Sequence, residues 1–159
     1  MKKLTSLVLL AVVIATGCNC SKKAVASADK KTQDIEFEYT AITRGSSKKA
    51  TINSKGVTSI TERGGKAETT AISVEDWNWL VSFYEDEIAK KNIKLEELNV
   101  PSKKHQFDGA LAANVSVMVG GEIYRSSTFD HGNPPPEIAA LVNKMIVIAG
   151  LDKQKNNED

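Results

Sequence analysis

The clearest pattern in the chain is an alternation of apolar and polar residues from position 35 to position 40. Ile35, Phe37 and Tyr39 alternate with two glutamates and a threonine, and this period of two predicts a β-strand with one buried face. Three more strand-like segments follow at 50–54, 57–62 and 67–72, separated by short stretches that contain glycine and lysine. Their spacing predicts an antiparallel meander.

Beyond the meander, the spacing of apolar residues changes to three and four. The residues on this spacing are Trp77, Leu80, Val81, Tyr84 and Ile88. They predict a helix over residues 74–91 with one apolar stripe packed on a sheet. Ser73 and Asp76 have the spacing of a capping box at its start, and Asn92 is a suitable residue for its C-terminal end.

The second half of the chain predicts a hairpin and a final helix. Apolar and polar residues alternate on both sides of Gly120-Gly121, a pair typical of a two-residue hairpin loop. Prolines from Pro134 to Pro136 precede a helical apolar pattern that ends at Gly150, and proline starts and glycine ends are typical of helices. We therefore expect an α+β fold, with an antiparallel sheet of about five to six strands, a meander plus a hairpin, covered on one face by two α-helices.

The N-terminus has the composition of a secretion signal. Met1-Lys2-Lys3 precedes a mostly apolar run from Leu4 to Ala15. A helix of this length spans about 18 Å, well short of the roughly 30 Å hydrocarbon core of a bilayer. We therefore expect residues 1–17 to be a cleaved signal peptide rather than a membrane span.

Small residues lead directly into Cys18 in the segment Ile14-Ala15-Thr16-Gly17-Cys18. This segment resembles the lipobox of bacterial lipoproteins. The resemblance implies that the Cys18 thiol carries a diacylglyceryl group, that cleavage precedes Cys18, and that the new N-terminus is acylated with a fatty acid such as palmitate. Two or three acyl chains hold a protein durably on a membrane, whereas one chain does not. The alternative is an ordinary signal peptide, and the role of Cys20 stays open.

The mature chain divides into three parts. Residues 18–33 carry the lipid and then form a polar segment without hydrophobic periodicity, typical of a flexible tether. Residues 34–150 are expected to form a single domain, and residues 151–159 a disordered tail. Asn19 is not the aspartate that often marks inner-membrane retention in lipoproteins, so the resemblance implies a place in the cell envelope, on the outer membrane and facing the periplasm.

Composition and missing motifs narrow the classes of function. The chain has 21 Lys and Arg against 20 Asp and Glu, without the basic face that nucleic acid binding requires. Because no cysteine follows Cys20, the body of the chain has no cysteine-based metal site. The sequence contains no Gly-x-Ser-x-Gly elbow, P-loop or Gly-x-Gly-x-x-Gly pattern, so we expect no cofactor and no enzymatic activity.

A few side chains outside the predicted core are candidates for a binding surface. Trp79 lies on the flank of the helical stripe and is a candidate anchor for a partner. Tyr124 and Arg125 lie in the predicted hairpin. Arg125 either pairs with Glu36 or Glu38 across the sheet or forms the polar centre of a recognition face.

Asp130 and His131 complete the candidate surface, in the turn before the final helix. Asp130-His131-Gly132-Asn133 is typical of a turn in which Asp and Asn bond local backbone N–H groups and Gly132 supplies a positive φ. A less favoured alternative joins Asp130 and His131 to His105 and Asp108 in a two-histidine, two-carboxylate site for zinc or iron.

The segment from Asp108 to Leu141 combines a strand that follows an aspartate, a glycine-containing hairpin, Thr128-Phe129-Asp130, and prolines leading into an apolar helix. This arrangement resembles emfourin-like domains, small bacterial α+β proteins whose namesake inhibits thermolysin-type metalloproteinases. We expect a lipid-anchored, non-enzymatic binding module whose partners are the membrane, through its anchor, and an envelope protein or proteinase. The alternatives are an emfourin-like proteinase inhibitor and, more remotely, a metal-dependent enzyme.

Overall fold

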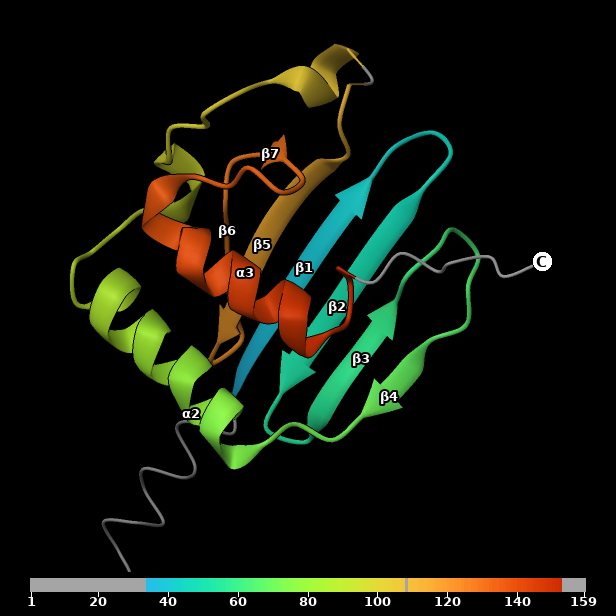
Figure 1. Cartoon of the computed structure of the whole chain (residues 1–159). Helices are drawn as coiled ribbons and strands as arrows, with labels where there is room; N and C mark the ends of the chain where they lie inside the picture. The colour runs from blue at the N-terminus through green and yellow to red at the C-terminus, as the bar shows by residue number, and fades with distance from the viewer. Residues whose placement is uncertain (1–33, 108, 153–159) are drawn as a thin grey trace, which may run out of the picture. The chain divides into compact units, whose positions relative to one another are not determined.

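The computed structural model describes residues 34–107 and 109–152, and this part of the chain forms one antiparallel sheet with two helices packed on it (Figure 1). The strands are β1 (Ile35–Ile42), β2 (Ser47–Asn53), β3 (Gly56–Ile60), β4 (Glu68–Thr70), β5 (Ala112–Val119), β6 (Glu122–Arg125) and β7 (Phe129–Asp130). Their order in the sheet is β4-β3-β2-β1-β5-β6, and β7 pairs with β5. The expected signal peptide, Cys18 and the tether lie outside the described residues.

The α+β class and the placement of both helices on one face are confirmed. Helices α2 (Val74–Phe83) and α3 (Ala139–Ile148) lie on the same side of the sheet in Figure 1. The meander β1–β4 and the hairpin β5–β6 are both present. None of the described helices is both long and apolar enough to cross a bilayer.

Strand β1 is central, and its alternation sets the two faces of the sheet. Ile35, Phe37 and Tyr39 are buried beneath the helices, with at most 2% of each residue exposed. Phe37 lies opposite Ile52 of β2 and Val117 of β5, so the apolar positions of three strands align in one layer. A one-residue shift in register would turn this whole layer to the solvent.

Helix α2 starts as expected but ends differently. The Ser73 hydroxyl accepts a hydrogen bond from the Asp76 backbone N–H at 3.0 Å, and Trp77, Leu80 and Val81 are buried. Residues Tyr84–Ala89 then form a π-helix. The expectation of one α-helix over residues 74–91 is therefore wrong beyond Phe83. The spacing of apolar residues did not reveal this change, because the four-residue step from Tyr84 to Ile88 is compatible with an α-helix as well as with a π-helix. Asn92 ends the element with a φ of 52°.

The segment between the sheet halves contains two short 3₁₀-helices, η2 (Leu95–Glu97) and η3 (Lys104–Phe107), and a third, η4 (Pro136–Ile138), precedes α3. Helix α3 buries Leu141, Val142 and Met145. Gly150 follows it with a φ of 63°, a backbone conformation that favours glycine.

Leu151 corrects the expected domain boundary. The sequence predicts a disordered tail from residue 151, yet the side chain of Leu151 is fully buried. Its backbone N–H donates to the Ile146 carbonyl at 2.9 Å, and its own carbonyl accepts from Lys48 Nζ at 2.6 Å. The folded part therefore includes Leu151, while residues 153–159 of the expected tail lie outside the described residues.

Candidate functional site

The face of the sheet opposite the helices is the first candidate site, and we call it the open face. It carries the side chains that alternate with the core residues on each strand. One row across it consists of successive register partners on six strands, namely Thr69, Thr58, Thr51, Glu38, Ser116 and Arg125. In the part of the chain that the structure describes, no helix or strand packs over this face. Within the described residues, the open face is therefore a broad and mostly polar surface.

Arg125 lies at one end of this row, beside a small hollow of about 80 Å³. Its Nε donates to the Ser116 hydroxyl at 3.1 Å. Glu38 instead pairs with Lys49 at 2.6 Å, and Glu36 accepts from Asn53 Nδ2 at 3.0 Å. Among the described residues Arg125 forms no ion pair with either glutamate, which corrects the first of the two roles expected for it.

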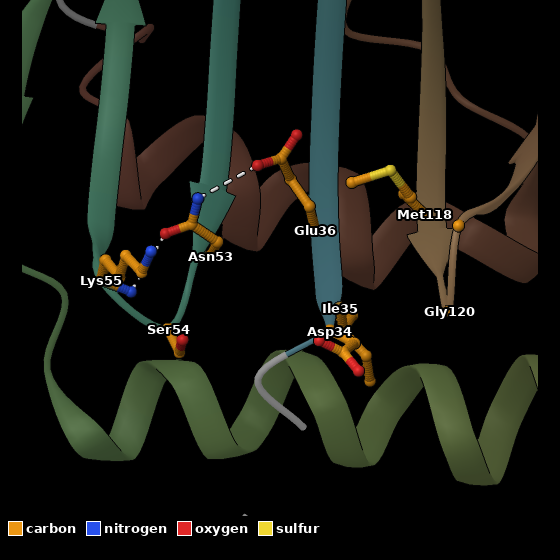
Figure 2. A pocket seen from close by; sticks show the side chains of 9 residues that line it. Asp34, Ile35, Glu36, Asn53, Ser54, Lys55, Met118 and Gly120 are labelled. Carbon is orange, nitrogen blue, oxygen red and sulfur yellow. Dashed lines mark hydrogen bonds between the residues drawn. The ribbon is translucent and has the colours of Figure 1, made fainter. Parts of the chain in front are cut away.

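A second, larger hollow of about 490 Å³ adjoins the first at the end of the open face where β1 begins. Figure 2 shows Glu36, Asn53 and Met118 side by side on neighbouring strands, with Asp34, Lys55 and Gly120 at its rim. Met118 and Glu36 line both hollows. The two hollows are therefore neighbours on the open face, and Arg125 lines the smaller one.

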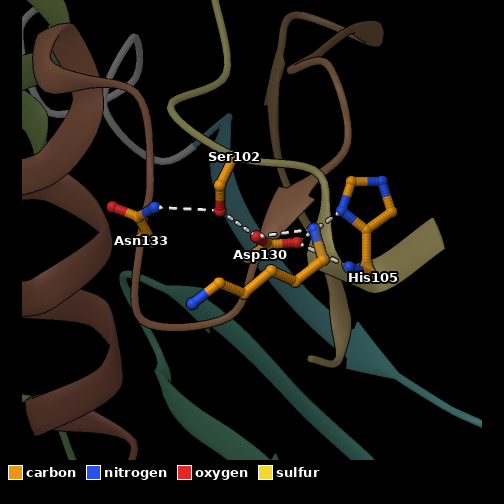
Figure 3. A network of polar contacts seen from close by, with 5 residues as sticks. Ser102, His105, Asp130 and Asn133 are labelled. Carbon is orange, nitrogen blue, oxygen red and sulfur yellow. Dashed lines mark hydrogen bonds and ion pairs between the residues drawn. The ribbon is translucent and has the colours of Figure 1, made fainter. Parts of the chain in front are cut away.

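Asp130 lies apart from the open face, in a polar network near η3 (Figure 3). Its carboxylate is almost fully buried, with the residue 2% exposed. It accepts hydrogen bonds from the Ser102 hydroxyl, from the backbone N–H of Lys104 at 3.0 Å, and from the backbone N–H of His105 at 2.8 Å. His105 Nδ1 adds a fourth contact at 2.6 Å.

These donors correct the expected role of Asp130. Its backbone carbonyl does accept from the Asn133 N–H at 2.8 Å, and Gly132 has a φ of 82°, so the local turn is confirmed. The carboxylate, however, binds donors about 25 positions earlier in the chain, not the turn itself. Burial alone would raise the pKa of Asp130, but the hydrogen bonds from Ser102, His105 and Lys104 outweigh burial and hold this pKa well below its usual range.

His131 points to a different partner from its neighbour Asp130. Its Nδ1 lies 2.6 Å from the hydroxyl of Tyr39, a fully buried residue of β1. Burial raises the pKa of Tyr39, so the hydroxyl keeps its proton, and the tautomer of the His131 ring sets which of the two atoms donates. Burial, and then the positive charge of Lys48, lower the pKa of His131 and favour the neutral ring.

Trp79 and Tyr124 are the partly exposed aromatic candidates. Trp79 is 37% exposed on α2, stacks on Phe83 with ring centroids 5.2 Å apart, and has Lys144 Nζ 5.8 Å from its ring centroid. Trp77 is 9% exposed and meets Phe37 edge-on, so the expected helix phase is confirmed. Tyr124 is 46% exposed and lies beside Tyr84 and Ile88, towards the helices.

The five candidates therefore do not gather on one surface. Arg125 faces the open side of the sheet, Trp79 and Tyr124 lie on the helical side, and Asp130 is buried rather than exposed. Within residues 34–107 and 109–152, no group of three or more His, Cys, Asp or Glu side chains is placed to hold a metal ion. Asp108, one member of the alternative metal site, lies outside these ranges.

Comparisons with known proteins add no relative. No protein-family model, curated protein or solved structure matches the chain.

Proposed function

We propose that the protein is a lipid-anchored lipoprotein of the cell envelope whose folded part binds another envelope protein without catalysing a reaction. The lipobox-like segment ending at Cys18 supports the anchor. The open face supports the binding role, and it is the observation on which the proposal rests. A six-stranded path with one covered and one uncovered face offers a rigid surface of fixed side-chain spacing.

Arg125 and its neighbours give the open face a suitable centre for an interface. Arg125 bonds to Ser116 through Nε, and its Nη atoms have no partner among the described residues. Met118 and Ile123 lie in the same hollow, and Ile123 is 63% exposed. Arginine and large apolar groups are enriched at the energetic centres of interfaces. The partner therefore offers a carboxylate to Arg125 and an apolar side chain to Met118 and Ile123.

Site-specific photocrosslinking in cells tests this role with a matched pair of positions. Ile123 on the open face and Val147 on α3 are each 63% exposed, so a photoreactive phenylalanine at either position has equal access to solvent. We expect a discrete adduct from position 123, lost when Arg125 is changed to Glu, and no such adduct from position 147. The adduct is identified by mass spectrometry and confirmed by binding of the purified pair.

Two outcomes would contradict the proposed binding role. Equal amounts of adduct from positions 123 and 147 would show that the partner does not prefer the open face to the surface of α3. An adduct unaffected by Arg125→Glu would remove the arginine from the interface. If the identified partner is a metalloproteinase whose activity falls on binding, the emfourin-like inhibitor replaces the general binding module.

The anchor has a separate test that does not depend on the partner. Cys18→Ser removes the thiol that would accept the lipid, and we expect the protein to be released from the membrane or to persist as an uncleaved precursor. Metabolic labelling with a radioactive fatty acid measures this directly. Label that persists on the Cys18→Ser protein would disprove the anchor while leaving the binding role intact.

A further inference from the structure

Strand β6 is the last strand on its side of the sheet (Figure 1), and all four of its residues are exposed. Among the described strands it pairs with β5 alone. The unpaired edge of a strand presents backbone N–H and C=O groups that can pair with a further strand. The turn that joins β5 to β6 determines which of these groups point outwards.

Both residues of that turn, Gly120 and Gly121, have a positive φ, of 59° and 90°, as in the type I′ turn of a two-residue hairpin loop. The residues that flank such a loop, Val119 and Glu122, form a hydrogen-bonded pair. Hydrogen-bonded and non-hydrogen-bonded pairs then alternate along an antiparallel ladder. Glu122 and Tyr124 therefore direct their N–H and C=O groups towards β5.

The backbone groups of Ile123 and Arg125 consequently point away from β5, to the outer edge of β6. The hydrogen bonds that follow the strand keep the same alternation. The Ser126 N–H donates to a carbonyl of β5 at 2.8 Å, and the Ser127 N–H donates to the Leu95 carbonyl of η2 at 3.1 Å. Thus η2 occupies the outer edge at Ser127. Among the described residues, the N–H and C=O groups of Ile123 and Arg125 have no hydrogen-bond partner.

Hollows lie on both faces of the sheet beside this free edge. On the open face, Ile123 and Arg125 line the small hollow of about 80 Å³. On the helical face, another hollow of about 210 Å³ lies between Tyr124 and the π-helical turn, and its lining includes Tyr84 and Ile88. Successive side chains of a strand point to opposite faces. Neighbouring side chains of a strand added to β6 would therefore lie beside one hollow each.

The hollow on the helical face suits an apolar side chain. No charged residue lines it, and its lining includes the rings of Tyr84 and Tyr124 and the aliphatic side chains of Ile88, Ile93 and Leu95. Burial of an apolar side chain against such a lining is favourable, because it removes apolar surface from water.

The open face suits an acidic side chain at the neighbouring position. The Nη atoms of Arg125 have no partner among the described residues, and a carboxylate matches the two parallel donors of a guanidinium. Glu36 and Glu38 lie on β1, and β5 and β6 separate β1 from the outer edge. At about 4.8 Å between neighbouring strands, an added strand would lie about 14 Å from β1. The two glutamates therefore do not oppose a carboxylate at this edge.

We propose that an extended segment of the partner protein pairs with the outer edge of β6 as an additional strand. Its backbone exchanges hydrogen bonds with Ile123 and Arg125. An acidic side chain meets the Arg125 guanidinium, and the next side chain, which is apolar, enters the hollow at Tyr124. Main-chain bonds supply the affinity in this mode of recognition, and the side-chain hollows supply the specificity. The inference rests on the proposed binding role, because it states which part of that partner binds and how.

Amide hydrogen exchange of the isotope-labelled full chain, followed by NMR in detergent micelles, tests the free edge. We expect the amides of Ile123 and Arg125 to exchange quickly and the amide of Tyr124 slowly, because only Tyr124 donates to β5. Slow exchange at all three positions would mean that the edge is already covered, and would contradict the inference. Sedimentation would then show whether a second copy of the chain covers it.

A photoreactive phenylalanine at position 124 tests the added strand against binding to the open face alone. We expect positions 123 and 124 to give adducts with the same protein, at partner residues one or two positions apart. An adduct from position 123 alone, or adducts at distant parts of the partner, would contradict the added strand and leave the proposed binding role intact. Adducts from neither position, or from position 124 alone, would contradict both.

Ile123→Pro and Ile123→Ala form a matched pair, because both remove the isoleucine side chain but only proline removes the outward N–H. Thermal melting checks that both variants are folded. With the purified partner that the adducts identify, we expect Ile123→Pro to bind roughly tenfold more weakly than Ile123→Ala. Equal affinities would contradict the added strand. If Ile123→Pro does not fold, exchange in the unaltered chain decides, since the partner must slow exchange at Ile123 and Arg125, and unchanged rates would disprove the inference.

Discussion

The two faces of the sheet are formed by the same strands but differ in burial and in polarity. On the face beneath α2 and α3, Phe37, Tyr39 and Ile52 are fully buried. On the open face, the alternate residues Glu36, Glu38 and Thr51 are partly exposed and polar. The covered face supplies the stability of the fold through apolar burial, so the open face can vary in chemistry without loss of the fold.

The same contrast applies to the hydrogen bonds of the buried polar groups. Tyr39 and Asp130 are buried, and each has its hydrogen-bond partners within the chain. Arg125 on the open face uses one nitrogen and leaves the others free. Buried polar groups must be paired because an unpaired one loses its bonds to water without replacement. The free donors therefore gather where a partner can reach them.

The largest expected effect comes from neighbouring residues of β1 that face opposite ways. Phe37→Ala should lower the free energy of unfolding by about 3–5 kcal/mol, because it removes buried apolar surface and leaves a cavity. Glu38→Ala should cost less than about 1 kcal/mol, since its pair with Lys49 is partly exposed. Urea denaturation of both variants measures the difference. Similar losses would mean that the open face is covered in the folded protein.

A smaller difference is expected between the two tryptophans of α2. Trp77→Ala should cost about 3 kcal/mol because the ring is packed against Phe37. Trp79→Ala should cost roughly 1 kcal/mol, because the ring is more than one-third exposed. Denaturant melts followed by circular dichroism test this pair. Equal losses would show that the outer side of α2 is also buried.

The covered face should also make stability depend on pH through His131. Burial lowers its pKa below the unfolded value of about 6.5, so the unfolded chain binds the proton first as the pH falls. Stability is therefore full above about pH 6.5 and declines as the pH falls towards the lower pKa of the folded state. Thermal melts between about pH 7.5 and pH 5 should show the decline.

His131→Gln is the control for this pH effect. Glutamine can still accept a hydrogen bond from Tyr39 but has no proton to gain in this range. The melting temperature of this variant should change little over the same interval. The pKa of Asp130 is lowered too, but its contribution is lost only at pH values below about 3.9. An unchanged pH profile in His131→Gln would assign the effect to another group.

The smallest effect on stability is expected at the centre of the open face. Arg125→Ala should change the free energy of unfolding by no more than about 0.5 kcal/mol, because the side chain is exposed and its one bond, to Ser116, can be replaced by water. The same variant should weaken binding of the partner. A large loss of stability would give Arg125 a structural role instead.

Local sequence patterns predicted the elements and the faces of the fold. The alternation of Ile35, Phe37 and Tyr39 and the helical spacing of Trp77 and Leu80 arise because one side of each element is buried. The π-helical turn at Tyr84–Ala89 was missed because Tyr84 and Ile88 are four positions apart, a step that an α-helix also accommodates. The burial of Leu151 was missed because a single apolar residue before a polar tail has no period.

The candidate sites were less predictable because their contacts join distant parts of the chain. Asp130 binds Ser102, Lys104 and His105, and His131 contacts Tyr39 at a separation of 92 positions. No local pattern specifies such partners, although the sequence did single out His105, Asp130 and His131 as chemically capable. The open face is different, since its polar character follows directly from the alternation along β1 and β5.

The central position of β1 has a mechanical consequence. Any force applied through the chain before Asp34 enters the sheet at its middle strand, which is paired along its length with β2 on one side and β5 on the other. Pulling on β1 along its axis loads both ladders in shear, so many hydrogen bonds share the force. An edge strand pulled along its axis would load only one ladder. With the proposed anchor at Cys18, the domain could bear a load between the membrane and a bound partner.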